Sequence, residues 1–409
     1  MKPKILILLF VIHLFLMFYN LEKWAPFGWD QVDNAWAAMR IISIHKFPLL
    51  GMVAKGNSGI YIGPLYYYFV ALFYALTRMD PIAAPIIAGV TSLFSFWVIY
   101  FVTKRIMDER VAVVSVAVYT FSSFIITTER VQWPVNFIAP FSLLILYFLY
   151  RVITGNAKYF LYLGAIVGLS FHIHFTAIFY PIIVLGAMPL VQWNKVAFKY
   201  FLGAIGIGLL FFIPQIIYYL QAEHGQAISG YVASYYHGFH LTRFLQLTPD
   251  AFIKFQSILM TPYTWTRYIS FLFVPVFLVL HRKKLAYLVA LWFLVPWIVF
   301  TTYSGEISDY YFSLQSYVAV MILAYGTVRA WDLKYIAAKI LMSAFWFYWI
   351  VANVQVFFNT NPGNLTENRT VAKTASTTAR IIPFTEGDPQ SYLYYYYMYR
   401  KGGWLPYKL

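Results

Sequence analysis

The sequence predicts an all-α protein that crosses a membrane many times, and three observations carry this prediction. Of its 409 residues, 61% are hydrophobic, 21% are aromatic and only 11% are charged, a profile of many spans through lipid rather than of a water-soluble domain. Uncharged stretches recur that are long enough to cross roughly 30 Å of hydrocarbon as helices of about 20 residues. Lysine and arginine gather in alternate turns between these stretches.

Net charge and cysteine content exclude several classes of function. A net charge of +15 would suggest nucleic acid in a soluble protein, but here it reflects basic turns on one face of the bilayer, and we expect no nucleic-acid partner. Cysteine is absent, which excludes disulfides, thiol nucleophiles and cysteine metal sites. Lys2 and Lys4 precede the apolar run 5–19 without a small-x-small cleavage site, so we expect an uncleaved first span.

Hydropathy along the chain predicts about eleven spans. The run 159–193 is too long for one span and divides at "FHIHF", whereas 268–281 is short but apolar throughout. The other predicted spans are 5–19, 82–103, 111–128, 134–150, 200–220, 285–302, 311–328 and 335–358.

The stretch 63–77, "GPLYYYFVALFYALT", is apolar but has only 15 residues and many tyrosines. If it spanned the membrane, the basic turn "TKRIMDER" would lie opposite Lys2 and Lys4, against the positive-inside rule. If it lies in the interface, all the basic turns share the cytoplasmic side. We therefore expect an interfacial helix, paired with a second one that starts near Asp30.

This sidedness divides the chain into a membrane part, 1–358, and a small extracytoplasmic segment, 359–409, which we expect to dock on the membrane part. The first outer loop, 20–81, and a long loop, 221–267, lie on the outer face. The outer side also gathers rare polar residues. They are Glu129, Arg130, His172, His174, Glu306 and Asp309. Such a distribution predicts a site that opens to the extracytoplasmic face of the cytoplasmic membrane.

Two carboxylates in "FGWDQVDNAW", the residues 27–36, stand out because acids are scarce, 15 in all. Asp30 can serve as a helix N-cap, with Asp33 at the third helical position. The alternative to this capping role is a catalytic role. A carboxylate can take a proton from an acceptor hydroxyl while a cation on the same side, Arg130, stabilises a departing phosphate. Arg130 can also simply anchor a helix end at the lipid headgroups.

Five segments, in order, resemble a known family. They are "WDQVDNAW", "GIYIGPLYYYFVALFYAL", "ERVQWPVNFIAPF", "GLSFHIHFTAIFYP" and "DYYFSLQSYVAVMILAYG". Together they resemble the GT-C membrane glycosyltransferases, in particular the bacterial and archaeal relatives of the protein O-mannosyltransferases and the lipid A aminoarabinose transferases. The resemblance covers about residues 1–330. It implies a GT-C fold and inverting transfer of a monosaccharide from a polyprenyl-phosphate donor to an acceptor hydroxyl of a lipid, glycan or protein.

The resemblance also implies roles for individual residues. Asp30 takes the place of the catalytic base, and Arg130, with Lys55 ranked below it, that of the contact to the donor phosphate. This chain has Asp30-Gln31 where family members often have Asp-Glu, which puts a metal-binding role of that pair in doubt. The residues expected along the donor or acceptor cavity are Asp33, Tyr66, Trp133, Asn136, His172, His174, Asp309, Tyr310 and Tyr311.

We expect no cofactor and no metal. His172 and His174 stand two residues apart and would point away from each other on a helix, and two nitrogen ligands alone do not make a divalent-cation site. The rival from another class is a non-catalytic polyprenyl-lipid binder or transporter, which would keep the cavity but need no base. An inactive paralogue that serves as an assembly partner is a third alternative.

Overall fold

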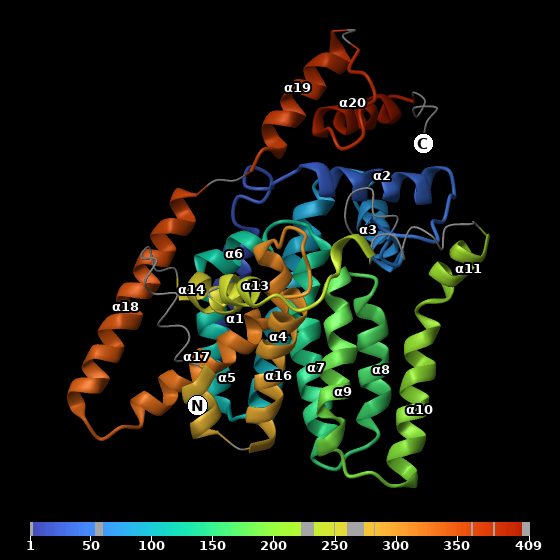
Figure 1. Ribbon diagram of the computed structural model, residues 1–409. Coiled ribbons are helices and arrows are strands. Elements are labelled where there is room, and N and C mark those ends of the chain that lie inside the picture. The colour runs from blue at the N-terminus through green and yellow to red at the C-terminus, as the bar shows by residue number, and fades with distance from the viewer. Residues whose placement is uncertain are drawn as a thin grey trace.

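The computed structural model describes residues 3–53, 60–221, 233–248, 250–259, 274–281, 283–360, 363–378 and 381–402. The regular secondary structure of these residues is helical. The only extended pairings among them are two isolated bridges, Val53 with Tyr61 and Tyr236 with Tyr303. Figure 1 shows a bundle of steep helices, one helix, α2, lying across its upper end, and two C-terminal helices, α19 and α20, above α2.

Five helices in the described ranges are long and apolar enough to cross a membrane, and two bent helix pairs bring the number to seven if each is one span. The five are α4 (Ala83–Ile106), η1 with α7 (Pro134–Ile153), α16 (Lys283–Phe300), η5 with α17 (Asp309–Trp331) and α18 (Ile336–Asn359). The shorter apolar helices at the remaining predicted spans are α1 (Pro3–Phe18), α8 (Tyr159–Ser170) and the run η2 (Phe175–Ile178), α9 (Phe179–Ala187) and η3 (Met188–Leu190).

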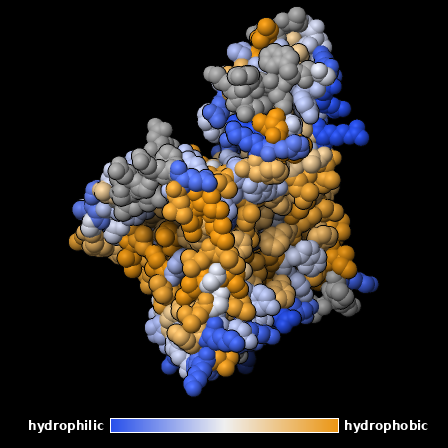
Figure 2. Space-filling view, turned by 90° about the vertical axis from the view of Figure 1, so that its right-hand side faces the viewer, coloured by the Kyte–Doolittle hydropathy of each residue, from blue (hydrophilic) through white to orange (hydrophobic). Residues whose placement is uncertain are grey.

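The chain is thus a multi-pass membrane protein, and the number eleven stays a prediction. Residues 268–273 of the predicted span 268–281 lie outside the described residues. Figure 2 shows a broad band of hydrophobic side chains between hydrophilic ends, as expected for a bundle surrounded by lipid.

Two predicted spans are not straight, which corrects the sequence prediction. In place of a single helix over 111–128, α5 (Glu109–Phe121) and α6 (Ser123–Glu129) meet at 69°. Ser122 caps α6, since its Oγ accepts a hydrogen bond from the backbone N–H of Ile125. In place of one helix over 200–220, α10 (Lys195–Leu210) and α11 (Ile213–Gln221) meet at 52°.

The first outer loop forms two helices packed on each other, α2 (Trp29–Ser43) and α3 (Leu65–Leu76). With twelve residues, α3 is about 18 Å long, well short of the hydrocarbon core. Its length therefore agrees with the interfacial helix that the sequence predicts.

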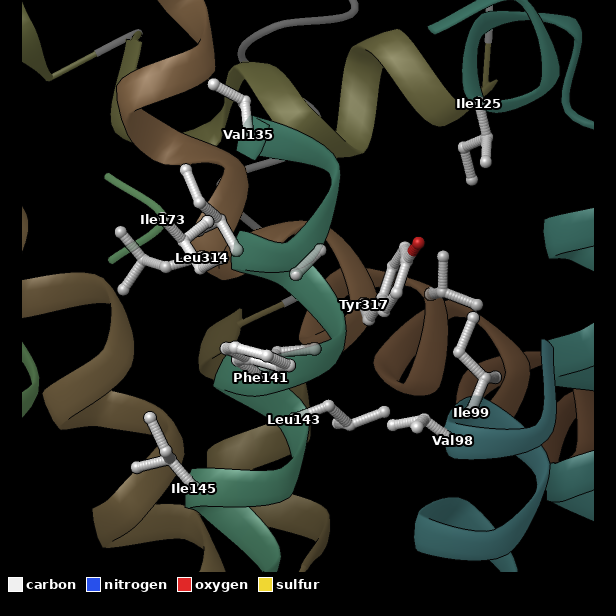
Figure 3. Close-up of a cluster of buried hydrophobic side chains, with 14 of the residues drawn as sticks. Val98, Ile99, Ile125, Val135, Phe141, Leu143, Ile145, Ile173, Leu314 and Tyr317 are labelled. Atoms are coloured by element: carbon white, nitrogen blue, oxygen red, sulfur yellow. The ribbon is translucent and has the colours of Figure 1, made fainter. Parts of the chain in front are cut away.

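The bundle is held by close packing and by buried polar contacts, because apolar side chains gain little by leaving lipid for protein. Figure 3 shows buried side chains of α4, α7 and the η5–α17 region converging on one cluster. Within it, Trp292 Nε1 donates to Ser142 Oγ at 2.7 Å, and Ser142 Oγ donates to the carbonyl of Leu314 at 2.6 Å. Between α8 and α10 the backbones touch, since a Cβ on Gly164 would lie 2.2 Å from the carbonyl oxygen of Ala204.

The C-terminal segment docks on the first outer loop. Its helices α19 (Leu365–Thr377) and α20 (Pro389–Arg400) pack on each other, and α20 packs on α2. The ring of Trp36 on α2 meets that of Tyr392 on α20 edge to face at 4.9 Å. In the long outer loop, the described helices are α13 (Leu241–Leu247), η4 (Asp250–Phe252) and α14 (Ile253–Leu259).

Candidate active site

Asp30 occupies the first turn of α2 without serving as its cap. The helix begins at Trp29. The backbone N–H of Gly28 donates a hydrogen bond to Gln31 Oε1 at 2.9 Å, so Gln31 rather than Asp30 caps the helix. The carboxylate of Asp30 is half-buried and makes no hydrogen bond or ion pair within the described ranges. Burial, and then the nearby charge of Asp33, raise the pKa of Asp30. A half-buried carboxylate of raised pKa is suited to accept a proton.

A chain of hydrogen bonds links α2 to the turn 130–133. Gln31 Nε2 donates to the carbonyl of Gln132 at 2.7 Å, and Gln132 Nε2 donates to the hydroxyl of Tyr66 at 2.7 Å. Tyr66 is buried, and its burial, with a smaller contribution from the charge of Asp30, raises its pKa. Asp30 and Tyr66 are thus electrostatic neighbours at the edge of this turn.

Next to the same turn lies a cavity of about 220 Å³, here called the polar cavity. It contains four of the predicted cavity residues, Trp133, Asn136, Asp309 and Tyr310. The other lining residues are Phe124, Ile125, Thr128, Glu129, Val135, Ala139, Lys254, Ser313, Ser316 and Tyr317. The lining residues therefore come from α6 and the turn after it, from η1 and α7, from α14, and from η5 and α17.

The polar cavity contains a buried cation, Lys254 of α14. Its side chain is 3% exposed, its Nζ lies 3.9 Å from Asp309 Oδ2, and it sits over the ring of Phe124 at 5.5 Å. Burial lowers the pKa of Lys254 to about 8, with Asp309 acting in the opposite direction. The site thus holds a cation that has lost most of its hydration and that has, among the described residues, one distant carboxylate as an ion-pair partner, which favours the binding of an anion.

Glu129 is the second charged residue that sequence reasoning did not place in the cavity. Its side chain is buried and accepts a hydrogen bond from the hydroxyl of Tyr317 at 2.6 Å. In the sequence, Lys254 was a lone charge in the apolar run "AFIKFQSILM", a signal that could have marked it. Glu129 was counted among the rare polar residues of the outer side but was not assigned to the cavity.

Aromatic rings line one side of the site. Trp133 and Tyr310 meet edge to face at 4.9 Å, and the ring of His174 lies 5.5 Å from Tyr310 and 5.6 Å from Tyr311. His174 and Tyr311, both predicted at the cavity, thus stand behind the lining residue Tyr310. Asn136 Nδ2 donates to the carbonyl of Val131 at 2.8 Å, so this side chain holds the shape of the turn.

Tyr66 is not among the residues that line the polar cavity, and two further predicted cavity residues lie elsewhere. Asp33 faces α3, where its Oδ2 accepts a hydrogen bond from the hydroxyl of Tyr67 at 2.6 Å. His172 Nδ1 accepts from the backbone N–H of Leu65 at 3.3 Å, so its Nε2 carries the proton and donates to the carbonyl of Phe211 at 2.8 Å. His172 therefore ties the start of α3 to the bend between α10 and α11.

Arg130 also differs from its predicted place. Its guanidinium turns toward the end of α1, where it donates to the carbonyls of Leu16, Met17 and Tyr19, and it packs over the ring of Trp24 at 5.4 Å. Arg130 is buried and is not among the residues that line the polar cavity. It caps α1, since helix C-termini leave carbonyls without partners. Lys55, the other predicted phosphate contact, lies outside the described residues.

Comparison with known proteins identifies the fold. Residues 62–218, less than half of the chain, match the model of the dolichyl-phosphate-mannose-protein mannosyltransferase family. No curated protein sequence matches the chain. In the parts that the structure describes, no group of three or more His, Cys, Asp or Glu side chains could hold a metal ion.

Solved structures resemble the whole chain. ArnT from Cupriavidus metallidurans bound to undecaprenyl phosphate has 12% identity and a TM-score of 0.61, and the match covers 97% of this chain and 69% of ArnT. The oligosaccharyltransferase AglB from Archaeoglobus fulgidus, in complex with an inhibitory peptide and a dolichol-phosphate, has 11% identity and a TM-score of 0.59. That match covers 96% of this chain but only 59% of AglB. The chain therefore has the fold of the GT-C membrane glycosyltransferases.

Proposed function

We propose that this GT-C-fold protein is an inverting glycosyltransferase that moves a monosaccharide from a polyprenyl-phosphate donor to an acceptor hydroxyl on the extracytoplasmic face of the cytoplasmic membrane. One observation carries the proposal. The carboxylate of Asp30 is half-buried without a partner in the described ranges, beside the turn that leads to a cavity with the buried cation Lys254.

The reaction needs a base and an anion site. Asp30 takes the proton of the acceptor hydroxyl as its oxygen forms a bond to the anomeric carbon of the sugar. The bond from that carbon to the phosphate oxygen breaks, and its electron pair leaves with the phosphate. Attack opposite the leaving group inverts the anomeric configuration. A phosphate leaves without a general acid, so Asp30 suffices as the only proton-transfer residue.

Lys254 takes the phosphate-binding role that the sequence assigned to Arg130. The guanidinium of Arg130 is engaged by three carbonyls of the α1 end, whereas Lys254 Nζ lies in the polar cavity, where Asp309 is its one ion-pair partner among the described residues. A cation in a water-poor site stabilises the charge that develops on a departing phosphate more strongly than an exposed one. The rings of Trp133 and Tyr310 supply flat apolar faces on which a sugar can rest.

The comparisons support the donor class. The matching family is named for dolichyl-phosphate-mannose, one similar structure holds undecaprenyl phosphate and another holds a dolichol-phosphate. All three are isoprenoid lipids with a phosphate at one end. The acceptor is a hydroxyl of a lipid, a glycan or a protein.

The test is release of polyprenyl phosphate from a panel of polyprenyl-phosphate monosaccharides, with membrane extract as a source of acceptor. We expect Asp30→Asn to lower the rate on the order of a hundredfold or more, because the variant loses its base, while donor binding stays near that of the wild type. The matched control is Asp108→Asn, the same change at the N-cap of α5, where asparagine also caps. Tight donor binding without release of polyprenyl phosphate, unchanged in Asp30→Asn, would instead indicate a lipid binder or transporter.

A further inference from the structure

The proposed base and the polar cavity belong to different layers of the molecule. Asp30 lies on α2, which crosses the upper end of the bundle, whereas segments of the bundle itself, among them α6, η1 and η5, line the polar cavity (Figure 1). Along the chain, α3, α4 and α5 separate α2 from α6, so chain continuity does not fix the distance between them. A contact between the two layers therefore sets where the carboxylate of Asp30 lies relative to the cavity.

Gln31 makes this contact. Its side chain is buried, its Oε1 accepts a hydrogen bond from the backbone N–H of Gly28 at 2.9 Å, and its Nε2 donates to the backbone carbonyl of Gln132 at 2.7 Å. The first bond closes the start of α2, and the second crosses to the turn after α6. Asp30 directly precedes Gln31 in the sequence, and Trp133, which lines the polar cavity, follows the contacted carbonyl. The base and the cavity wall are therefore joined through neighbouring residues and a hydrogen bond.

The turn that carries this carbonyl is itself held by further hydrogen bonds. Arg130 donates to three carbonyls at the end of α1, and Asn136 Nδ2 donates to the carbonyl of Val131 at 2.8 Å. The side chain of Gln132 is 1% exposed, and its Nε2 donates to the hydroxyl of Tyr66 on α3 at 2.7 Å. A carbonyl in a turn that is fixed on three sides offers α2 a well-defined anchor.

The contact requires a side-chain amide. A carbonyl oxygen can only accept, so the group that faces Gln132 has to donate, while the group that faces the N–H of Gly28 has to accept. Glutamine offers both, whereas an ionised glutamate offers acceptors alone and would add a second negative charge beside Asp30. Because the side chain of Gln31 is buried, an unmatched group there would not find water as a substitute partner. The glutamine is thus matched to the two backbone groups that it joins.

We infer that Gln31 is a positioning residue of the proposed transferase, whose amide holds the carboxylate of Asp30 in place relative to the polar cavity by joining the start of α2 to the carbonyl of Gln132. The inference rests on the proposed function and deepens it, because it names the residue through which the base is oriented. Gln31 acts through Asp30, since an amide side chain does not itself take up the proton. Placement matters because an error of about 1 Å at a reacting group can cost about a hundredfold in rate.

The experiment is a double-variant cycle on the release of polyprenyl phosphate. Gln31→Met keeps the length of the side chain and removes both hydrogen bonds. We expect it to lower kcat on the order of tenfold, with KM for the donor changed by less than about twofold. In the Asp30→Asn background the same change should alter the residual rate by less than about twofold, because no base is left to position.

Two further variants complete the cycle. Gln31→Glu keeps an acceptor for Gly28 and loses the donor to Gln132, so it should repeat the result if Gln31→Met does not fold. Gln215→Met is the matched control, the same change at a buried glutamine of α11 that is not among the residues lining the polar cavity. It should leave the rate of release unchanged in both backgrounds.

A merely structural role of Gln31 predicts a different pattern. Loss of folded protein or of donor affinity lowers the rate by the same factor whether or not the base is present. Equal factors in the wild-type and Asp30→Asn backgrounds would therefore overturn the inference and leave the proposed function standing, as would wild-type release by folded Gln31→Met. Release by Asp30→Asn as fast as by the wild type would overturn the proposed function, and the inference with it.

Discussion

At the scale of single residues, the proposed site depends on Asp30 and Lys254, whose pKa values are shifted in opposite directions. Burial and Asp33 raise the pKa of Asp30, so this carboxylate stays protonated to a higher pH than usual. Burial lowers the pKa of Lys254 to about 8, so the ammonium loses its proton at a lower pH than usual. A base needs the deprotonated form and a phosphate ligand needs the charged form, so both requirements are met together only over a limited range of pH.

The first prediction is a bell-shaped pH profile of kcat/KM. The value should rise as Asp30 deprotonates, at a pH above the ordinary range of an aspartate, and fall above about 8 as Lys254 becomes neutral. Residual activity of Lys254→Met should lack the alkaline limb. Lys199→Met, a change at an exposed lysine of α10, should keep both limbs. An alkaline limb that persists in Lys254→Met would contradict the assignment.

The second prediction concerns Arg130. Because its guanidinium satisfies three carbonyls at the end of α1, Arg130→Met should lower stability by about 1–3 kcal/mol, the cost of buried acceptors left without a donor. Donor affinity of the folded variant should stay unchanged. Thermal unfolding and donor binding measure the two effects. A large loss of donor affinity at unchanged stability would return Arg130 to the phosphate site.

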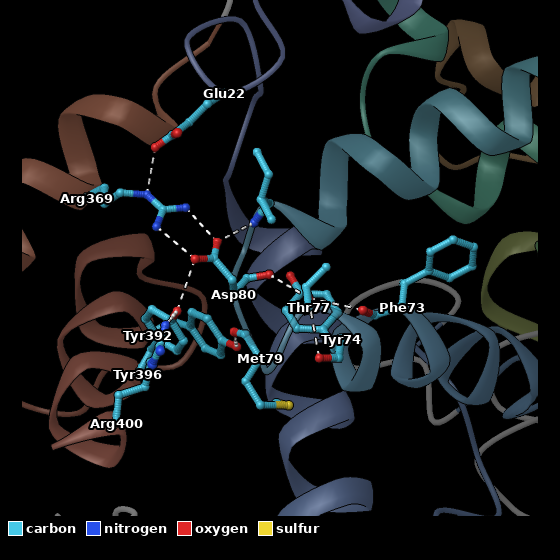
Figure 4. A network of polar contacts seen from close by, with 11 residues as sticks. Glu22, Phe73, Tyr74, Thr77, Met79, Asp80, Arg369, Tyr392, Tyr396 and Arg400 are labelled. Carbon is cyan, nitrogen blue, oxygen red and sulfur yellow. Dashed lines mark hydrogen bonds and ion pairs between the residues drawn. The ribbon is translucent and has the colours of Figure 1, made fainter. Parts of the chain in front are cut away.

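At the scale of helices, a polar network fastens the C-terminal segment to the first outer loop (Figure 4). Arg369 of α19 donates to both carboxylate oxygens of Asp80, at 2.7 and 3.1 Å, and its Nε lies 2.8 Å from Glu22. The hydroxyl of Tyr396 on α20 donates to Asp80 at 3.0 Å. Burial alone would raise the pKa of Asp80, but hydrogen bonds from Arg369, the backbone N–H of Ile82 and Tyr396 outweigh it and hold this pKa below its usual range.

The third prediction is that Arg369→Met undocks α19 and α20. We expect a loss of about 1.5–3 kcal/mol, the range for hydrogen bonds to charged groups, seen as faster proteolysis after residue 360. Because the folded pKa of Asp80 is depressed, its contribution is complete at neutral pH and disappears as the pH falls through that lowered pKa. Lys373→Met, at an exposed residue of the same helix, should change neither the stability nor the rate of proteolysis. Equal proteolysis of the two variants would show that apolar packing on Trp36 suffices.

At the scale of the whole molecule, the hydrophobic band separates two ends of different composition (Figures 1 and 2). One end carries α2, the polar cavity and the C-terminal helices. Turns rich in lysine and arginine lie at the other, and there Arg110 pairs with Asp332 at 2.8 Å. The positive-inside rule predicts that the basic end faces the cytoplasm, and we therefore expect Asp30 and Lys254 to lie on the outer side.

The fourth prediction tests this orientation, and the absence of cysteine makes the test direct. Thr374→Cys, exposed on α19, should react with a membrane-impermeant maleimide in intact cells. Thr154→Cys, exposed in the basic turn after α7, should react only after the membrane is permeabilised. The reverse pattern would place the site in the cytoplasm and exclude the proposed donor orientation.

The sequence by itself determined the class of the protein. Composition and hydropathy predict an all-α membrane bundle, because burial in lipid requires long apolar helices whose signal is local. The resemblance of the ordered motifs to a known family implies the GT-C fold. Four of the predicted cavity residues, Trp133, Asn136, Asp309 and Tyr310, line one cavity. They come from turns whose polar residues the sequence shows directly.

Only the tertiary structure shows which cation lines the polar cavity. Arg130 follows Glu129 and Lys254 stands in an apolar run, and the directions of both side chains depend on distant segments. Arg130 turns to the end of α1 and Lys254 turns to η5. The bend at Ser122 depends in the same way on Asn353, whose side chain accepts from the N–H of Ser123, 230 positions away along the chain. A local pattern gives the length of a helix, but the direction of a buried polar side chain is set by whichever partner satisfies its hydrogen bonds in the folded molecule.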